Sequence, residues 1–314
     1  MSRAGVASIV VVVAAVAVMG VVAWMAKAPG SRASTEDETD GNVRIVVLSP
    51  ALAVTMVDLG LESSIVGRHG WDYVLDKRVP VCGDQAGIDY ETLLRAKPTH
   101  VVLEWGRREL ASKLVEMAER EGWKLLDFDL LTVQEIGESV VALAREFDGL
   151  VDVRRPELEG AGGSSAQDLV ERMFPRGGET FGGRVLLLWP SSPPAAVGPG
   201  SFHQEILERV GGVAAIEEGS AYIELDAEDV LGLAPDGIVL IAAREVGSEA
   251  REYSWEQIEA MLGAIAGLDV PAVRERRVAV VDDPLVLTPS TAMIDFQRAL
   301  VEVLGEWRAG ESGR

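Results

Sequence analysis

Residues 197–212 read Val-Gly-Pro-Gly-Ser-Phe-His-Gln-Glu-Ile-Leu-Glu-Arg-Val-Gly-Gly and contain the most concentrated polar motif of the chain. Ser201 follows a Gly-Pro-Gly turn and Gln204 stands three positions later, which predicts a capped helix. The free N–H groups at the start of such a helix can bind a polar ligand, although an ordinary structural helix has the same pattern. Ser201 and His203 do not form an acyl-transfer pair, because residues two apart on a helix do not face each other.

Metal binding is the second chemistry to weigh, and it rests on the three histidines of the chain, His69, His100 and His203. His69 and His203 could face each other across a cleft, with Glu104 or Asp283 nearby, whereas His100 precedes a predicted strand and reads as structural. Two histidines with uncertain carboxylates are a weak basis for a metal centre. We therefore predict no dedicated metal site.

The loops that follow the predicted strands carry aromatic side chains. Trp71, Trp105 and Trp189 lie in these loops, and Tyr73 lies beside the first of them. Ligands of open parallel sheets bind beyond the carboxyl ends of the strands, and aromatic faces there suit a large, partly apolar ligand. Each tryptophan alone could merely cover the edge of its own sheet, but three together favour a binding cleft.

Arginines in the same loops could meet anionic groups of such a ligand. They are Arg107 and Arg108 after one predicted strand and Arg244 after another. The residues that we predict to contact a ligand are Ser49, His69, Trp71, Tyr73, Trp105, Arg107, Trp189, Ser201 and Arg244.

An internal duplication defines the elements that position these loops. Residues 88–103 align without a gap with residues 225–240, and residues 44–50 align with residues 184–190. In each copy an aspartate can cap a short helix, a proline ends it, and an apolar strand follows. Two similar halves in one chain naturally leave a cleft between them.

Short apolar runs alternate with amphipathic helical patterns in both halves, which indicates an α/β fold with parallel sheets covered by helices on both faces. We predict an N-terminal α/β lobe over residues 43–132, a helical connection over residues 133–180 and a C-terminal α/β lobe over residues 181–308.

Composition narrows the class of partner. The 314 residues are 48% hydrophobic, enough for a large core, and the formal net charge is -21. That charge argues against nucleic acid, which needs a basic footprint, and against docking on anionic lipid. Cys82 is the single cysteine, so no intramolecular disulfide can form.

Residues 6–25 form an uncharged, mainly apolar run, about the length that crosses a bilayer as a helix. The run is longer than the roughly 7–15 apolar residues of a signal peptide. A cleavage pattern at Ala26-Lys27-Ala28 is followed by Pro29, an awkward residue after a cut. We predict a transmembrane anchor over residues 1–28 and a flexible tether over residues 29–42, with a cleaved signal as the alternative. Both place the body of the protein outside the cytoplasm.

The combined motifs resemble the bacterial ABC-importer substrate-binding proteins for cobalamin and ferric siderophores, the class III periplasmic binding proteins. The resemblance covers about residues 43–304 and rests on Ser49-Pro50, Leu59-Gly60-Leu61, Ile65-Val66-Gly67, residues 89–102 and residues 198–212. It implies two Rossmann-like lobes, joined by one long helix with limited hinge motion, that hold a ligand between them.

The resemblance also implies site residues. A tryptophan at the position of Trp105 lines the ligand, and an acidic residue on each lobe docks to arginines of the membrane permease, near Glu109 and Glu205 here. Two features depart from the family: the lipid-anchoring cysteine is missing, and Pro156 with the glycines at 160, 162 and 163 interrupts the predicted inter-lobe helix.

The leading prediction is a monomeric, membrane-tethered periplasmic protein that captures a metal chelate, cobalamin or a ferric siderophore, and delivers it to an ABC permease without a cofactor or a chemical step. One alternative is a binder of haem or a bare metal ion. Another is a tethered sensing or interaction module without a transport role. An enzyme is disfavoured, because the chain lacks a nucleophile–base pair.

Overall fold

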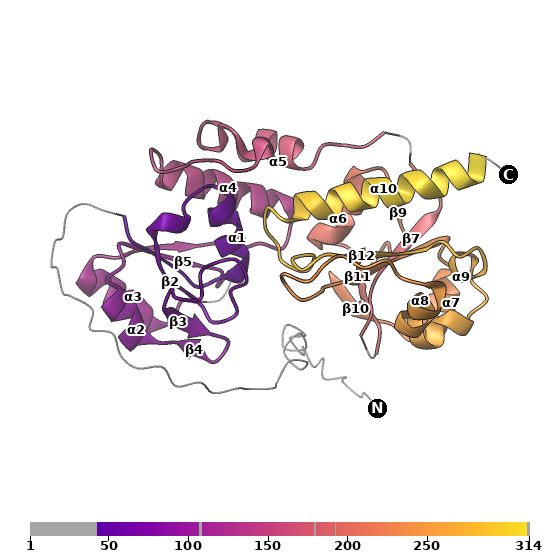
Figure 1. The fold of residues 1–314 in the computed structure, drawn as a ribbon, viewed down its shortest axis with the longest axis horizontal. Coiled ribbons are helices and arrows are strands. Elements are labelled where there is room, and N and C mark those ends of the chain that lie inside the picture. Colours follow the sequence, from indigo (N-terminus) through magenta and orange to yellow (C-terminus); the bar gives the residue numbers. More distant parts are fainter. Residues whose placement is uncertain (1–42, 107–108, 179, 192, 313–314) are drawn as a thin grey trace, which may run out of the picture. The chain divides into compact units, whose positions relative to one another are not determined.

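The described residues form two six-stranded sheets (Figure 1). The first sheet contains the strands between residues 45 and 127. The computed structural model describes residues 43–106, 109–178, 180–191 and 193–312. The strand order is β4-β3-β2-β1-β5-β6. These strands are β1 (Ile45–Val47), β2 (Ile65–His69), β3 (Val81–Asp84), β4 (Gly87–Ile88), β5 (His100–Leu103) and β6 (Lys124–Asp127). The helices between them are α1 (Pro50–Asp58), η2 (Glu62–Ser64), α2 (Tyr90–Ala96) and α3 (Ser112–Glu121).

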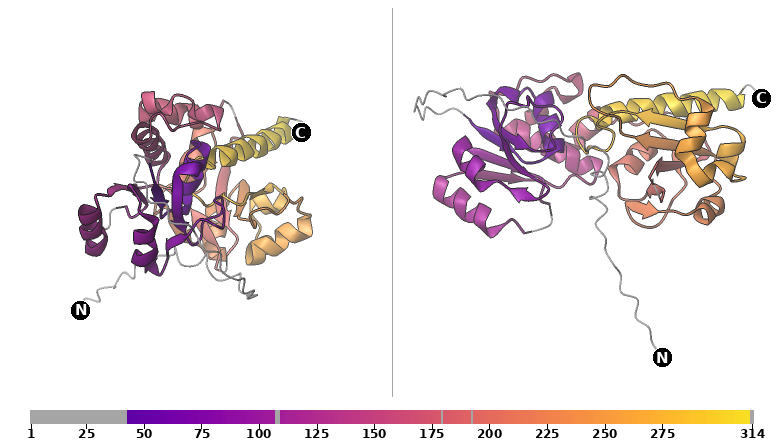
Figure 2. Two further views of the ribbon diagram at one scale, coloured as in Figure 1. Left: turned by 60° about the vertical axis from the view of Figure 1, so that its left-hand side comes forward. Right: turned by 60° about the horizontal axis from the view of Figure 1, so that its bottom comes forward.

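The second sheet has the order β10-β8-β7-β11-β12, with β9 beside β7. Its strands are β7 (Arg184–Trp189), β8 (Ala195–Val197), β9 (Val213–Ala214), β10 (Tyr222–Glu224), β11 (Gly237–Ala242) and β12 (Val278–Asp282). Its helices are α6 (Phe202–Arg209), α7 (Ala227–Leu233), α8 (Trp255–Leu262), η5 (Gly263–Gly267), α9 (Pro271–Arg274) and α10 (Met293–Ser312). The right-hand view of Figure 2 shows the two sheets as distinct groups of strands.

The prediction of parallel sheets holds for the central strands but not for the edges. Strand β4 pairs with β3, β8 with β7, and β10 with β8 in antiparallel fashion. A parallel crossover needs a connection of about a dozen residues. The links at residues 85–86 and 190–194 are shorter than that, so the chain can only turn back antiparallel.

The connection between the sheets begins with one uninterrupted helix, α4 (Val133–Glu146), whose capping box uses Thr132 and Glu135. Pro156 and the nearby glycines follow this helix rather than break it. They lie in a segment with two short 3-10 turns, η3 (Pro156–Leu158) and η4 (Ala161–Gly163), that leads to α5 (Ala166–Met173). The connection is therefore α4 and a packed return through α5, not one long helix.

The hydrophobic core of the described residues divides by sheet face. Ile45 and Val47 of β1 share one cluster with Leu187 and Val239 of the second sheet, together with buried residues of α1, α4, α5, α6 and α10. Val46 points to the other face, because neighbouring residues of a strand alternate, and it belongs to a separate cluster. The second sheet also has its own cluster on its opposite face. The two sheets are thus joined by a continuous core on one face only.

The duplicated segments adopt the same structure twice. Asp89 accepts hydrogen bonds from the N–H groups of Glu91 and Thr92 at the start of α2, and Asp226 does the same for Glu228 and Asp229 at the start of α7. Both helices end in the left-handed conformation with φ 44°, at Lys97 and at Ala234. The duplication is therefore confirmed as structural.

In the part of the chain that the structure describes, no helix is both long and apolar enough to cross a bilayer. The predicted span and tether, residues 1–42, lie outside the described residues.

Candidate ligand-binding site

The carboxyl ends of β1 and β5 meet at a hydrogen-bonded pair, Ser49 and Glu104. The two strands are parallel neighbours, with Val47 opposite Val102, so the residues that follow them come together. Ser49 is buried, and its Oγ donates to Oε2 of Glu104 at 2.6 Å while it accepts from the N–H of Leu52 at 3.1 Å. The cap of α1 therefore fixes the carboxylate of the exposed Glu104 at the end of the sheet.

Tyr222 of β10, in the second sheet, lies within electrostatic reach of this same carboxylate. The surrounding protein, and then the negative charge of Glu104, raise the pKa of Tyr222. Tyr222 is nevertheless 45% exposed. Glu104 and Tyr222, which belong to different sheets, therefore lie near each other at the surface.

Trp105 stands directly beside Glu104, and its loop is held at several points. Its backbone N–H donates to Oδ1 of Asp127 at 2.7 Å, and its indole N–H donates to the carbonyl oxygen of Glu109 at 2.9 Å. Gly106 continues the loop with φ 65°, a conformation that favours glycine. The half-buried indole is therefore held in place at the strand end where a ligand is expected. The predicted contact Arg107 lies outside the described residues.

His69, at the end of β2, begins the loop that carries Trp71 and Tyr73. Its Nδ1 accepts a hydrogen bond from the N–H of Trp71 at 3.1 Å. Burial lowers the pKa of His69, and this effect outweighs the negative charges of Asp84 and Asp72, which act to raise it. The ring is therefore neutral at pH 7. The neutral ring then carries its proton on Nε2 and offers a ligand a hydrogen-bond donor. Trp71 is half-buried, and Tyr73 is exposed.

On the second sheet, Trp189 is the last residue of β7 and is half-buried, opposite Ala195 of β8. Arg244 follows β11, but its guanidinium is already engaged. Nε donates to the carbonyl oxygen of Ser248 at 3.1 Å, and Nη1 donates to the carbonyl oxygen of Asp282. Two of the five N–H groups of Arg244 therefore hold the loop beside β12.

Ser201 and His203 on α6 are both buried. The Ser201 hydroxyl donates to the carbonyl oxygen of Gly198 at 2.7 Å and accepts from the N–H of Gln204 at 3.2 Å, so it acts as the cap of α6. His203 bonds through Nε2 to the carbonyl oxygen of Val286 at 2.7 Å. Its ring packs against Phe296, with the ring centroids 4.9 Å apart. His203 is enclosed by protein and does not share a cleft with His69. In the described ranges, no cluster of three or more His, Cys, Asp or Glu side chains could hold a metal ion.

The two predicted docking residues differ in environment. Glu109 is exposed. Glu205 is half-buried, and its Oε2 accepts from the N–H of Val133 at 2.9 Å, at the start of α4. Desolvation raises the pKa of Glu205, against the effect of this hydrogen bond. Glu205 therefore has a structural role that ties α6 to α4, and permease docking by either residue stays a prediction.

Tyr222 was not among the predicted contact residues, because the short edge strand β10 was not predicted. A signal for it does exist in the duplication. Strand β4 lies directly before Asp89, and β10 lies directly before the matching segment that begins with Leu225 and Asp226. An edge strand ahead of the first copy therefore predicts one ahead of the second.

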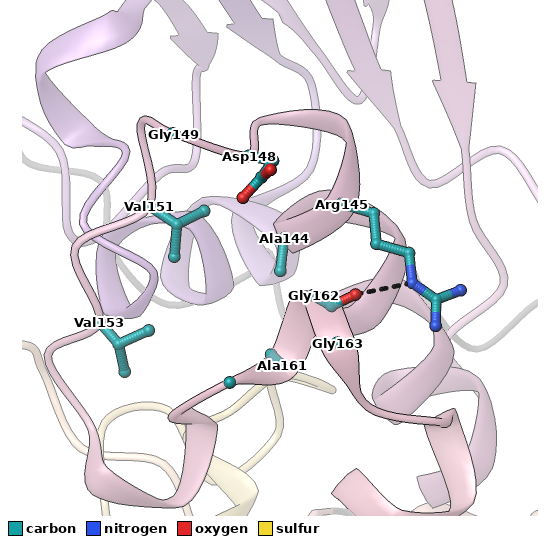
Figure 3. Close-up of a pocket in the computed structure, with 10 residues that line it drawn as sticks. Ala144, Arg145, Asp148, Gly149, Val151, Val153, Ala161, Gly162 and Gly163 are labelled. Atoms are coloured by element: carbon teal, nitrogen blue, oxygen red, sulfur yellow. Dashed lines mark hydrogen bonds between the residues drawn. The ribbon is translucent and has the colours of Figure 1, made fainter.

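A separate cavity of about 530 Å³ lies beside the connection (Figure 3). It is lined mainly by small residues of the end of α4, the following loop and η4. Its one cationic side chain, Arg145, donates from Nε to the carbonyl oxygen of Gly162 at 2.9 Å. The cavity offers no aromatic side chain, so we place the ligand site at the strand ends and not here.

No protein-family model matches the sequence. No curated protein matches it either. Among solved structures, the chain is similar to the periplasmic vitamin B12 binding protein BtuF of Vibrio cholerae, at 17% identity and a TM-score of 0.59 over 84% of this chain and 97% of that one. It is similar to an ABC transporter substrate-binding protein of Listeria monocytogenes, at 20% identity and a TM-score of 0.61 over 84% of this chain and 99% of that one. It is also similar to IsdE of S. aureus, solved with heme, at 18% identity and a TM-score of 0.58 over 83% of this chain and 98% of that one. These similarities establish the fold that the sequence motifs implied.

Proposed function

We propose that the chain is a monomeric, extracytoplasmic substrate-binding protein that holds a metal chelate between its two sheets and delivers it to an ABC permease. The observation that carries this proposal is the placement of Tyr222 and Glu104, from different sheets, within electrostatic reach of each other at the edge of a water-accessible surface. Three solved proteins with this fold are named for binding B12 or heme or as ABC transporter substrate-binding proteins. Nothing in the arrangement requires a chemical step.

The side chains at the strand ends favour a flat or bulky chelate. Trp71, Trp105, Trp189 and Tyr222 provide aromatic faces that can pack on a corrin, a porphyrin or a catecholate ring. A bare metal ion needs a cluster of oxygen, nitrogen or sulfur ligands instead, and the described residues contain no such cluster. The chelate is therefore preferred over the ion.

The electrostatics rank the chelates. Glu104 is an exposed carboxylate, the chain carries a formal net charge of -21, and the Arg244 guanidinium is held by Asp282 and Ser248. A neutral chelate rich in amide groups, such as cobalamin, can donate hydrogen bonds to Glu104. Anionic chelates such as haem or ferric catecholates are repelled there. A raised pKa also keeps the phenol of Tyr222 protonated at neutral pH, which works against an iron–phenolate bond. Cobalamin is the first candidate, a ferric siderophore the second and haem the third.

Titration of the full-length chain in detergent micelles tests this ranking. Cyanocobalamin, hemin and a ferric hydroxamate siderophore would each be added while tryptophan fluorescence and chelate absorbance are followed. We expect saturable one-to-one binding, tightest for cyanocobalamin. Trp105→Ala should weaken it at least tenfold, whereas Trp255→Phe on α8, away from the strand ends, should not. Absence of binding to all three chelates would refute the proposal.

The predicted anchor defines where the capture takes place. We propose that residues 1–28 keep the protein on the outer face of the cytoplasmic membrane. The test is fractionation of source cells with an antibody against the folded part. An intact chain in the membrane fraction supports the anchor. A shorter, freely released chain supports the cleaved signal instead.

The duplication suggests a specific permease-docking pair. Glu91 on α2 and Glu228 on α7 occupy matching positions and are exposed, as are Leu94 and Leu231. A permease built of two similar halves would meet two equivalent surfaces of this kind. Glu91 and Glu228 are therefore an alternative to the predicted docking pair, Glu109 and Glu205. Glu205 already accepts a hydrogen bond at the start of α4.

Uptake of labelled cobalamin by source cells would separate the two pairs. We expect Glu91→Gln with Glu228→Gln to abolish uptake without changing chelate affinity, and Glu109→Gln with Glu205→Gln to leave uptake within twofold. The reverse result would assign docking to Glu109 and Glu205. Normal uptake with both double variants would remove acidic docking from the proposal.

A further inference from the structure

Arg155, in the connection between the sheets, donates to two carboxylates that belong to different halves of the structure. Its Nε donates to Oδ2 of Asp58 at 2.5 Å, and its Nη2 donates to Oδ2 of Asp295 at 3.0 Å. Asp58 is the last residue of α1, which follows the first strand of the first sheet. Asp295 lies in the first turn of α10, which packs on β12 of the second sheet.

Neighbouring contacts strengthen both ends of this bridge. Thr291 donates from Oγ1 to the same Oδ2 of Asp58 at 2.5 Å, a direct bond between the two halves. On the first half, the N–H of Asp152 donates to the carbonyl oxygen of Leu59 at 3.0 Å. On the second half, Arg298 of α10 pairs with Glu157 of the connection. The segment at residues 152–157 is thus attached to α1 on one side and to α10 on the other.

The bridge is shielded from water more than most ion pairs of the described surface. The side chains of Arg155, Asp58 and Asp295 are 23%, 16% and 39% exposed, whereas those of Arg95 and Glu91 are 67% and 80% exposed. Exposed ion pairs contribute little to stability, because water and salt screen the two charges. This screening weakens as the pair becomes more buried. The bridge also lies at the face where the two sheets share one hydrophobic core.

We propose that Arg155 is an ionic latch between the two halves: by holding Asp58 of α1 and Asp295 of α10 with two arms of one guanidinium, it limits how far the halves can turn relative to each other. The shared core resists separation but has no direction, since hydrophobic contact is non-directional. The planar guanidinium adds a defined geometry, which a lysine ammonium cannot reproduce. This inference does not depend on the identity of the ligand.

The chain offers a matched control one residue away. Arg154 carries the same charge and belongs to the same segment, but its guanidinium contacts Glu62 at 3.2 Å, in the first half alone. Arg154→Met therefore removes a connector ion pair without removing a link between the halves.

The experiment is a spin–spin distance measurement on the full-length chain without ligand. Labels would be placed on Glu119→Cys in α3 and Ala260→Cys in α8, which are both exposed. Cys82 is buried, and the parent without added cysteines would confirm that it takes up no label. We expect Arg155→Met to at least double the width of the distance distribution, Arg155→Lys to widen it less, and Arg154→Met to leave it unchanged.

Hydrogen exchange of the amides at residues 56–60 and 291–296 gives a second readout, expected to be at least tenfold faster in Arg155→Met. If that variant does not fold, Asp295→Asn, which removes the charge held by one of the two arms, replaces it, with the same expectation for the distance distribution. An unchanged distribution in these variants, or an equal widening in Arg154→Met, would overturn the latch.

Discussion

The guanidinium of Arg44 donates to the carbonyl oxygen of Ala96, 2.8 Å away, where α2 ends. The second copy repeats this contact: Arg184 donates to the carbonyl oxygen of Leu233, 3.0 Å away, where α7 ends. Helix ends leave carbonyl groups without intrahelical partners, and an arginine just before β1 or at the first position of β7 satisfies them. The duplication therefore preserves a tertiary contact as well as a sequence pattern.

These contacts predict a stability effect. Arg44→Met and Arg184→Met should each lower the free energy of unfolding by about 1 kcal/mol, because each removes charged hydrogen bonds to helix carbonyls. Urea unfolding of the full-length chain measures this. The control is Arg95→Met, which breaks the exposed pair with Glu91 and should lower it by no more than about 0.5 kcal/mol. Equal effects at all three positions would contradict a specific role for the strand arginines.

Substitution of Gly60 should lower the free energy of unfolding further, because a side chain has no room there. Its φ is +78°, and a Cβ atom there would lie 2.1 Å from the carbonyl oxygen of Asp152. Gly60→Ala should therefore lower the free energy of unfolding by about 3 kcal/mol, from backbone strain and a clash with the connection. Gly122 has a similar φ of +74° in open space, so Gly122→Ala should lower it by about 1 kcal/mol. Thermal or urea unfolding distinguishes the two, and equal losses would show that the close approach to Asp152 is not tight.

Glu104 and Tyr222 predict a titration shift across the proposed cleft. Glu104→Gln removes a negative charge that helps to raise the pKa of Tyr222, so this pKa should fall toward 10 while desolvation keeps it above that value. Absorbance of the tyrosinate ion during alkaline titration measures the shift, with Tyr222→Phe identifying which tyrosine is responsible. An unchanged Tyr222 titration in Glu104→Gln would place the two residues too far apart to form one site.

His203 predicts a loss of stability in mild acid. Burial lowers the pKa of His203 from 6.5 to about 4 in the folded chain. As the pH falls from about 6.5 to about 4, the unfolded chain binds a proton that the folded chain does not, so the free energy of unfolding decreases, by at most about 3 kcal/mol. Below about pH 4 both states are protonated, and this contribution changes no further.

The variant His203→Gln can still donate to the carbonyl oxygen of Val286 but does not titrate. Its free energy of unfolding should vary less between pH 6.5 and 4 than that of the parent, as measured by urea unfolding at several pH values. His69→Gln is the comparison variant: burial also lowers the pKa of His69, but less than that of His203, so its pH profile should stay closer to that of the parent. If the pH profile of His203→Gln overlays that of the parent, the acid sensitivity has another origin.

The helix caps and strand ends around the site could be predicted from short stretches of the sequence. Asp89, Asp226 and Ser201 cap the helices that they were predicted to cap, and the strands before Glu104 and Arg244 end ahead of those residues as expected, whereas β7 continues through Trp189. Caps and strand ends depend on residues within a few positions of each other, so the chain encodes them directly. The α/β class followed for the same reason.

Which of those residues are accessible to a ligand depends on long-range packing and could not be predicted in this way. Nothing local shows that the ring of His203 is enclosed by Phe296 and bonded to Val286, or that the Arg244 guanidinium donates to the carbonyl oxygen of Asp282. The approach of Tyr222 to Glu104 and the two bonds of Arg155 likewise join residues far apart in the chain. Such contacts depend on how the sheets and the shared core pack, and packing selects among many partners that are equally compatible with the local sequence.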